Sequence, residues 1–207
     1  MTLYDYAISG AVCSNLITPR YFLPIGTDLP SVIEDAIPEF LADRKAVRNG
    51  TNTPYFTPAL SHRNAVYVMW IGTNDLGVHC FLTDSQVPGK TLTDYTRCVF
   101  AGLDTLYSAG ARYFVVNNVA PLQLTPLYAN DSYGGIGPNQ YWVDKPDNHT
   151  AIAELMTEYV TSVDTIFKQQ IPNEVYYSRR YPDARFALFD VYSLVRHLHS
   201  TPGKGRP

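Results

Sequence analysis

The sequence predicts an α/β protein in which helices cover both faces of a parallel sheet. Two short apolar runs, Ala65–Ile71 and Tyr113–Val116, have the composition of buried strands. Long amphipathic segments alternate with them, as crossover helices do between parallel strands. The 207 residues are 45% hydrophobic and 17% charged, which suits one folded domain over residues 1–207 and excludes a disordered chain.

The first third of the chain predicts a strand, a turn and a capped helix. Residues Tyr4–Ile8 read as a strand that meets a turn at Ser9-Gly10. A capping box, Ser31-Val-Ile-Glu34, starts a helix that Pro38 must disturb. One face of this helix is apolar: Ile33, Ile37, Phe40 and Leu41. The polar stretch 48–64 is predicted to be a surface loop.

The remaining elements follow from periodicity and stop signals. The predicted elements, in order, are a strand at Ala65–Ile71, a helix over about 91–109, a strand at Tyr113–Val116, a helix over about 148–170 ended by Pro172, a strand at Arg185–Phe189 and a short helix at 190–199.

Charge and hydropathy exclude some classes of function. A net charge of −3 argues against a generally basic surface for nucleic acid. The longest apolar run is too short to span a bilayer, and no signal-peptide pattern follows Met1. Three N-x-[ST] triplets, at Asn49, Asn130 and Asn148, are either glycosylation sites or chance matches.

The cysteines leave two interpretations open. Cys13, Cys80 and Cys98 allow one disulfide with a leftover thiol, or three reduced cysteines buried as small hydrophobes. The sequence does not choose a pairing.

Polar residues follow three of the predicted strands. The strand ends read Ser9-Gly10-Ala11, Gly72-Thr73-Asn74-Asp75 and Asn117-Asn118. In a parallel sheet, ligands bind at the carboxyl ends of the strands. Each of these sequences taken alone is also ordinary turn chemistry.

Taken together, these segments resemble a family. The segment 4–15, YDYAISGAVCSN, resembles the second conserved block of fungal GDSL-type (SGNH) hydrolases, and VYVMWIGTNDLG, 66–77, resembles the third, the G-x-N-D block. Segments 117–127 and 188–193 are similar to later parts of the fungal acetylesterases of carbohydrate esterase family 16. The resemblance runs through essentially the whole chain. It implies a three-layer α/β/α, flavodoxin-like fold with strand order 2-1-3-4-5, whose first strand is missing here.

The resemblance implies acyl transfer by a serine that a histidine activates and an aspartate orients. It also implies an oxyanion hole, to which Gly10 contributes its backbone N–H and Asn74 its side-chain amide. An amide suits this task because it donates a hydrogen bond without carrying a charge. We interpret Asp75 as structural, capping the following turn and fixing Asn74. The resemblance implies no cofactor and no metal, a small ester or acetylated saccharide as substrate, and a monomer.

The sequence departs from the family pattern at the catalytic residues. The 207 residues contain neither G-D-S nor D-x-x-H, the blocks that supply the nucleophile and the Asp/His pair. The stretch Asn130-Asp131-Ser132 is a decoy, because it follows no apolar strand and comes after G-x-N-D. Ser9 and Ser14 flank Gly10 without a base visible in the sequence.

No histidine replaces the missing base in the sequence. His197 and His199 read as polar positions of an exposed helix, and their i, i+2 spacing does not make a metal pair. His62 and His149 fall in loops or at a helix start. His79, which follows G-x-N-D-L-G, is the candidate for contact with substrate.

The tryptophans have two interpretations as well. Trp70, Trp142 and the many tyrosines could line a sugar-binding cleft, but core packing is the favoured interpretation for Trp70 within its strand.

We therefore expect a piece of a longer, secreted ester hydrolase that is truncated at both ends, keeps the oxyanion-hole half and is inactive as given. The alternatives are a non-catalytic carbohydrate-binding or interaction protein and a chain without independent function. Without the first strand, residues Tyr4–Ile8 would lack an inner neighbour in the sheet. We expect the chain to be unstable or to fold with this strand displaced.

Overall fold

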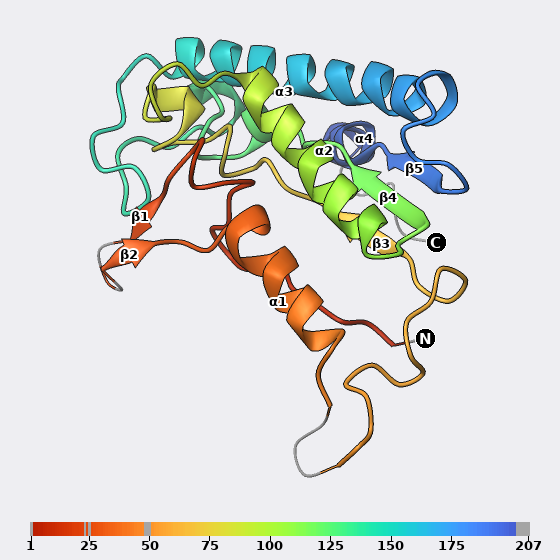
Figure 1. Cartoon of the computed structure of the whole chain (residues 1–207). Helices are drawn as coiled ribbons and strands as arrows, with labels where there is room; N and C mark the ends of the chain where they lie inside the picture. Colours follow the sequence, from red (N-terminus) through yellow and green to blue (C-terminus); the bar gives the residue numbers. More distant parts are fainter. Residues whose placement is uncertain (1, 23, 25, 48–50, 202–207) are drawn as a thin grey trace.

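The computed structural model describes residues 2–22, 24, 26–47 and 51–201 and combines a parallel sheet with helices (Figure 1). The sheet has the order β3-β4-β5, with β3 at Tyr67–Met69, β4 at Tyr113–Asn117 and β5 at Arg185–Phe189. Both pairings are parallel, as predicted. The arrangement is consistent with the three-layer α/β/α fold of GDSL hydrolases, so the predicted fold class is confirmed.

The long helices form where the sequence predicts them. Helix α2 spans Leu92–Ser108, α3 spans His149–Pro172 and α4 spans Val191–Ser200. A capping box of Thr91 and Asp94 starts α2, and the side chain of Asn148 caps α3. Helices α2 and α3 pack against each other (Figure 1) and share one apolar core with β4. No helix in the described ranges is long and apolar enough to cross a membrane.

The capping of the first helix differs in detail from the prediction. Ser31 accepts from the Glu34 backbone N–H at 3.0 Å, as expected. The carboxylate that accepts from the Ser31 backbone N–H, however, belongs to Asp35, at 2.8 Å. Glu34 reaches back to the Ser31 hydroxyl and not to its backbone N–H, and it also accepts from Ser14 Oγ at 2.6 Å. A single π turn, Val32–Ala36, precedes α1 at Ile37–Asp43, which places Pro38 in the first turn where its missing N–H costs little.

The N-terminal segment is where the secondary-structure prediction was wrong. Residues Tyr4–Ile8 form no strand. The Tyr6 hydroxyl instead donates to Asp43 of α1 at 2.7 Å, and the Tyr4 ring packs edge-on against Phe56. The segment therefore lies outside the sheet.

Several short elements have no counterpart in the prediction. A hairpin pairs β1, Tyr21–Phe22, with β2, Thr27–Asp28. Single 3₁₀ turns lie at Phe81–Thr83, Leu122–Leu124 and Asp131–Tyr133, and a π turn at Asn173–Tyr177 extends α3. Residues 51–64 are irregular, as expected of the predicted loop, whose residues 48–50 lie outside the described ones.

The apolar run 65–71 was predicted to be buried on both faces, and this is wrong. Met69 is buried, but Val66, Val68 and Trp70, which point to the opposite face, are 63%, 64% and 57% exposed. The core interpretation of Trp70 is therefore also wrong. Trp142, in contrast, is buried.

Candidate oxyanion site

The turn at Gly10 and the turn at Asn74 lie against each other, although residues Tyr4–Ile8 form no strand of the parallel sheet. Asn74 Nδ2 donates to the Ala11 carbonyl at 2.8 Å, and the Cys13 backbone N–H donates to Asp75 Oδ1 at 2.9 Å. The third polar strand end, Asn117-Asn118, forms its contacts with a different part of the chain. Asn118 donates to the Asp190 carboxylate at 2.9 Å and so ties the end of β4 to the start of α4.

The G-x-N-D turn has its shape because only glycine fits at its first position. Gly72 has φ +124°, which side chains rarely tolerate, and a Cβ there would overlap the Tyr95 hydroxyl. Tyr95 is fully buried on α2 and donates to the Ile71 carbonyl at 2.7 Å. Helix α2 thus fixes the turn that presents Asn74.

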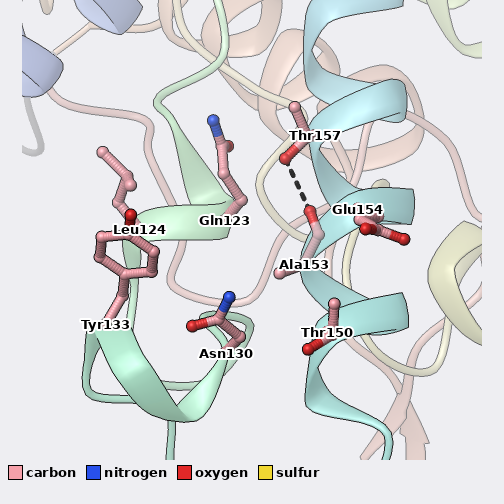
Figure 2. Close-up of a pocket in the computed structure, with 8 residues that line it drawn as sticks. All are labelled: Gln123, Leu124, Asn130, Tyr133, Thr150, Ala153, Glu154 and Thr157. Carbon is pink, nitrogen blue, oxygen red and sulfur yellow. Dashed lines mark hydrogen bonds between the residues drawn. The ribbon is translucent and has the colours of Figure 1, made fainter.

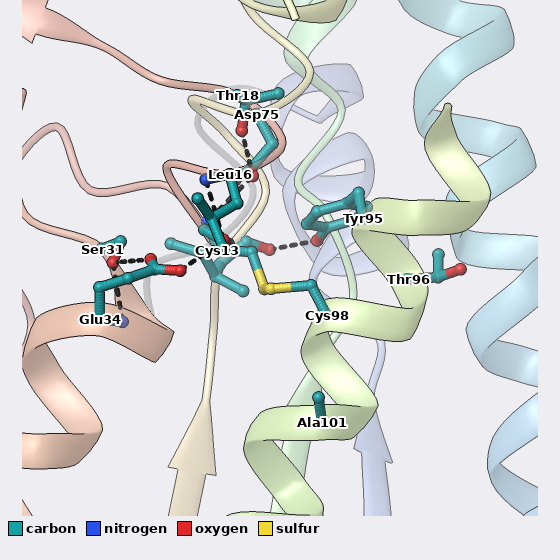
Figure 3. The surroundings of a disulfide bond; sticks show 12 residues. Cys13, Leu16, Thr18, Ser31, Glu34, Asp75, Tyr95, Thr96, Cys98 and Ala101 are labelled. Atoms are coloured by element: carbon teal, nitrogen blue, oxygen red, sulfur yellow. Dashed lines mark hydrogen bonds between the residues drawn. A yellow bond between two sulfur atoms is a disulfide. The ribbon is translucent and has the colours of Figure 1, made fainter. Parts of the chain in front are cut away.

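A disulfide fastens the other turn to the same helix. Cys13 is bonded to Cys98, one turn along α2 from Tyr95 (Figure 3). The bond settles the pairing that the sequence left open, and Cys80 is left as a buried free thiol. Burial, with the nearby Asp75 adding to it, raises the pKa of the Cys80 thiol to about 12, so the thiol is neutral and unreactive at neutral pH.

Asp75 connects the two turns from the inside. It is completely buried and accepts hydrogen bonds from the Cys13 backbone and from the Thr18 hydroxyl, each at 2.9 Å. Burial raises its pKa to about 6, against the opposing effect of these hydrogen bonds. Asp75 is thus structural, as we interpreted it, but it ties down the segment after Gly10 and does not cap its own turn.

Each of the two predicted oxyanion-hole residues has an N–H bond that donates to no acceptor within the described residues. Within the described residues, the Gly10 N–H has no hydrogen-bond partner. The Asn74 amide donates one proton to the Ala11 carbonyl, and no acceptor in the described ranges takes the other. Gly10 has φ +86°, and a Cβ there would lie 2.6 Å from Leu29 Cδ1. Stabilisation of an oxyanion requires N–H donors that no protein acceptor occupies, and both of these donors meet that one requirement.

Sequence reasoning missed one residue at this site. Arg20, at the base of the β1–β2 hairpin, donates from Nη1 to Asn74 Oδ1 at 2.5 Å and to the Gly10 carbonyl at 3.3 Å. No motif marks this arginine. The signal that could have identified Arg20 is its charge, because it is the first basic residue after Gly10 in the sequence.

The other candidate side chains do not supply the missing nucleophile and base. The Ser14 hydroxyl donates to Glu34 and not to a histidine. Ser132 is exposed and donates to its neighbour Asn130 at 2.8 Å. His149 does pair with Asp131, but its Nε2 is buried without a partner.

The remaining histidines lie on the surface. His79 is exposed at the far end of the G-x-N-D turn, and its backbone N–H donates to Thr83 at 2.9 Å. His62 is exposed in the loop before β3, and His197 and His199 are exposed on α4, as predicted. Among the described residues, no group of His, Cys, Asp and Glu is arranged to hold a metal ion.

Two cavities of the described part of the chain lie away from Gly10 and Asn74. The first, of about 240 Å³, lies between the turns around residues 123–133 and the first turns of α3 (Figure 2). Its lining includes Asn130, Tyr133 and Glu154. A second cavity lies between the segment 4–8 and α1. Neither contains a residue of the candidate oxyanion site.

Comparisons with known proteins show that nearly the whole chain is similar in sequence to an esterase. It is 40% identical over 204 residues to an acetylesterase of Hypocrea jecorina, covering 98% of this chain and 56% of that protein. It is 30% identical over 125 residues to an acetylesterase of Thermothelomyces thermophilus, covering 59% of this chain and 36% of that one. A GDSL esterase/lipase of Arabidopsis thaliana is 29% identical over 145 residues, 67% of this chain and 35% of the plant protein. No family model matches the chain. The chain spans little more than half the length of the Hypocrea jecorina acetylesterase.

Proposed function

We propose that the chain, an acetylesterase-like protein related to GDSL esterases, supplies the oxyanion-hole half of an ester hydrolase. The observation that carries the proposal is the pair of unclaimed donors, the Gly10 N–H and the second Asn74 amide proton, on turns that contact each other. Such donors lower the barrier to acyl transfer because they meet the charge on the carbonyl oxygen in the tetrahedral intermediate.

The mechanism assigns this chain one part of the reaction. A substrate ester would place its carbonyl oxygen between the Gly10 N–H and the Asn74 amide, and both would bind it most tightly after the nucleophile has attacked. Tyr95 and the disulfide hold the two turns on α2, so the donors need no rearrangement when charge develops. His79, exposed at the end of the Asn74 turn, is our candidate for contact with the rest of the substrate.

The substrate class we propose is a small ester or an acetylated saccharide, because two relatives are acetylesterases. The 207 residues by themselves we propose to be inactive, because they contain no G-D-S or D-x-x-H block and no serine that bonds a histidine within the described ranges.

The test grafts the chain into a complete relative. Residues 1–207 replace the matched region of the Hypocrea jecorina acetylesterase, and hydrolysis of p-nitrophenyl acetate is measured. We expect turnover by the chimera, none above background by the chain alone, and a loss of about 10²- to 10³-fold in kcat for Asn74→Ala in the chimera. Asn64→Ala, in the exposed loop before β3, is the matched control. An unchanged kcat in the Asn74→Ala chimera would refute the proposal.

We propose further that the chain is a secreted, glycosylated monomer that needs no cofactor. A disulfide that joins two distant segments is typical of proteins folded in an oxidising compartment. Asn148 caps α3 through its side-chain oxygen, so its nitrogen is left for a glycan. Peptide mapping of the chain secreted from a fungal host, with and without a glycosidase, tests whether the disulfide forms and whether Asn148 carries a glycan.

One observation favours a second function, carbohydrate binding without catalysis. Trp70 is 57% exposed, and an exposed tryptophan ring can stack on a sugar. Binding on a glycan array that Trp70→Ala abolishes and Asn74→Ala leaves intact would select this function over the first.

A further inference from the structure

We infer that Arg20 is the positioning residue of the oxyanion hole: its guanidinium fixes which way the Asn74 amide points and ties that amide to the Gly10 turn. The inference rests on the proposed function of Gly10 and Asn74. It assigns a role to a residue, and to a hairpin, that the family motifs do not contain.

The first step concerns the orientation of an amide. The oxygen and nitrogen of an asparagine side chain have nearly the same shape, so hydrogen-bond partners decide which end faces which neighbour. A guanidinium has only donors, and therefore only Oδ1 of Asn74 can face Arg20 Nη1, at 2.5 Å. The nitrogen is turned toward the Ala11 carbonyl, 2.8 Å away, and its second proton is left for substrate.

The second step concerns the Gly10 turn. The same Nη1 lies 3.3 Å from the Gly10 carbonyl, so one guanidinium nitrogen is shared between the two residues that carry the donors. Leu29 holds Gly10 from another side, because its side chain occupies the space where a Cβ would stand. The Leu29 backbone N–H donates to the Arg20 carbonyl at 2.7 Å. The hairpin between Arg20 and Leu29 therefore places both contacts on the same turn.

The third step concerns charge. Arg20 is half-buried and forms no ion pair with a carboxylate in the described part of the chain. Its charge therefore acts on the Asn74 amide without a counterion in contact. Polarisation of Oδ1 by a cation makes the Nδ2 protons better donors, which is the property an oxyanion hole needs.

The first arm of the test uses the 207-residue chain itself and needs no activity. We measure exchange of the Asn74 side-chain amide protons with solvent by NMR in the native chain and in Arg20→Met. We expect exchange of the proton bonded to Ala11 to accelerate by at least about tenfold in Arg20→Met, because the amide then rotates freely. Arg97→Met, an exposed arginine of α2, is the matched control and leaves the exchange unchanged. Unchanged exchange in Arg20→Met would overturn the inference.

The second arm uses the chimera with the Hypocrea jecorina acetylesterase. Arg20→Met is expected to lower kcat by about 10- to 100-fold with little change in KM, since a misplaced donor acts on the transition state. Arg20→Lys, which keeps a charge and a donor, restores part of kcat. In the Asn74→Ala background, Arg20→Met costs nothing further, a coupling that a merely structural arginine would not show.

The outcomes separate the two proposals. If Asn74→Ala lowers kcat and Arg20→Met does not, the positioning role of Arg20 is wrong and the oxyanion site stands. If Asn74→Ala leaves kcat unchanged, the oxyanion site itself is wrong, whatever the amide exchange shows. If Arg20→Met costs the same factor with and without Asn74, Arg20 acts through stability and the inference is overturned.

Discussion

The two faces of the sheet are made of the same apolar strands and have opposite surroundings. On the face toward α2 and α3, Met69, Phe114 and Val116 are at most 7% exposed. On the other face, Val66 and Val68 are more than 60% exposed, and Trp70 and Phe189 are each about half exposed. Successive side chains of a strand point to alternate faces of the sheet. Val68 pairs with Val115 on the one face, and Tyr67 pairs with Phe114 on the other.

The difference shows what an apolar strand does and does not specify. The run 65–71 has the composition of a strand that can be buried on both faces, but burial depends on the elements that cover it. The candidate site belongs entirely to the covered side, because Tyr95 and Cys98 of α2 hold its two turns. Stability and preorganisation of the site should therefore depend on the covered face and be insensitive to the open one.

The largest expected effect tests the covered face directly. Phe114 is 2% exposed and its ring stacks on Phe186 with centroids 4.6 Å apart. We expect Phe114→Ala to lower the free energy of unfolding by about 3–5 kcal/mol, as truncations of buried aromatic rings do. Phe189→Ala, on the open face of the neighbouring strand, should cost much less. Urea melts of both variants measure the difference, and equal losses would contradict the comparison.

The disulfide gives the next largest effect. It closes a loop across 85 residues and joins the Gly10 turn to α2. We expect Cys13→Ser with Cys98→Ser to lower the free energy of unfolding by about 2–5 kcal/mol, mainly because the unfolded chain gains freedom. Cys80→Ser is the control, since this thiol forms no disulfide. Denaturation in urea with and without reductant provides the measurement, and a reductant-insensitive midpoint would show that the bond does not hold the turn.

A third prediction uses two acids, Asp75 and Asp164, whose pKa values are raised by burial. Burial raises the pKa of Asp75 to about 6 and that of Asp164 to about 7, from 3.8. The folded chain therefore binds more protons than the unfolded chain between about pH 4 and 7, and its stability falls as the pH rises through this window. Hydrogen bonds from backbone N–H groups hold the pKa values of Asp94 and Asp190 below the usual value. These two residues therefore lose their contribution to stability only below this pH window.

The measurement for this prediction is a series of urea melts from pH 4 to 7.5. Asp75→Asn should flatten the profile by removing one of the two groups, with an effect of about 3 kcal/mol at pH 7. The exposed Asp144→Asn serves as the control and should leave the slope unchanged. A native chain that gains stability over the same pH range would show that neither acid titrates as described.

The sequence predicted those parts of the fold that a local pattern specifies. Helices α2 and α3 are long enough for their period to be read, and their caps, Thr91 and Asn148, lie where the pattern indicates. The strands β4 and β5 are apolar runs bounded by turn residues. The contact between the Gly10 and Asn74 turns is implied by the resemblance, but not by the polar strand ends, because residues 4–8 form no strand.

The features that the sequence did not reveal depend on partners far away in the chain. The β1–β2 hairpin has strands of two residues, too short to show a period, and Arg20 meets Asn74 across 54 positions. Three cysteines allow three single pairings, and geometry alone selects Cys13 and Cys98. The exposure of Trp70 is a property of the surrounding elements and not of its strand.

The smallest expected effect tests the open face. Val68→Thr exchanges a methyl group for a hydroxyl on a side chain that is 64% exposed, and should change the free energy of unfolding by less than about 0.5 kcal/mol. Val116→Thr makes the same exchange on the covered face, where the residue is 1% exposed and the hydroxyl would lie in the core; it should cost about 1–3 kcal/mol. The fluorescence of a hydrophobic dye bound to the native state should fall in Val68→Thr and not in Val116→Thr, because only the first removes exposed apolar surface. A loss for Val68→Thr as large as that for Val116→Thr would mean that the open face is covered in solution, and the contrast between the two faces would no longer describe the protein.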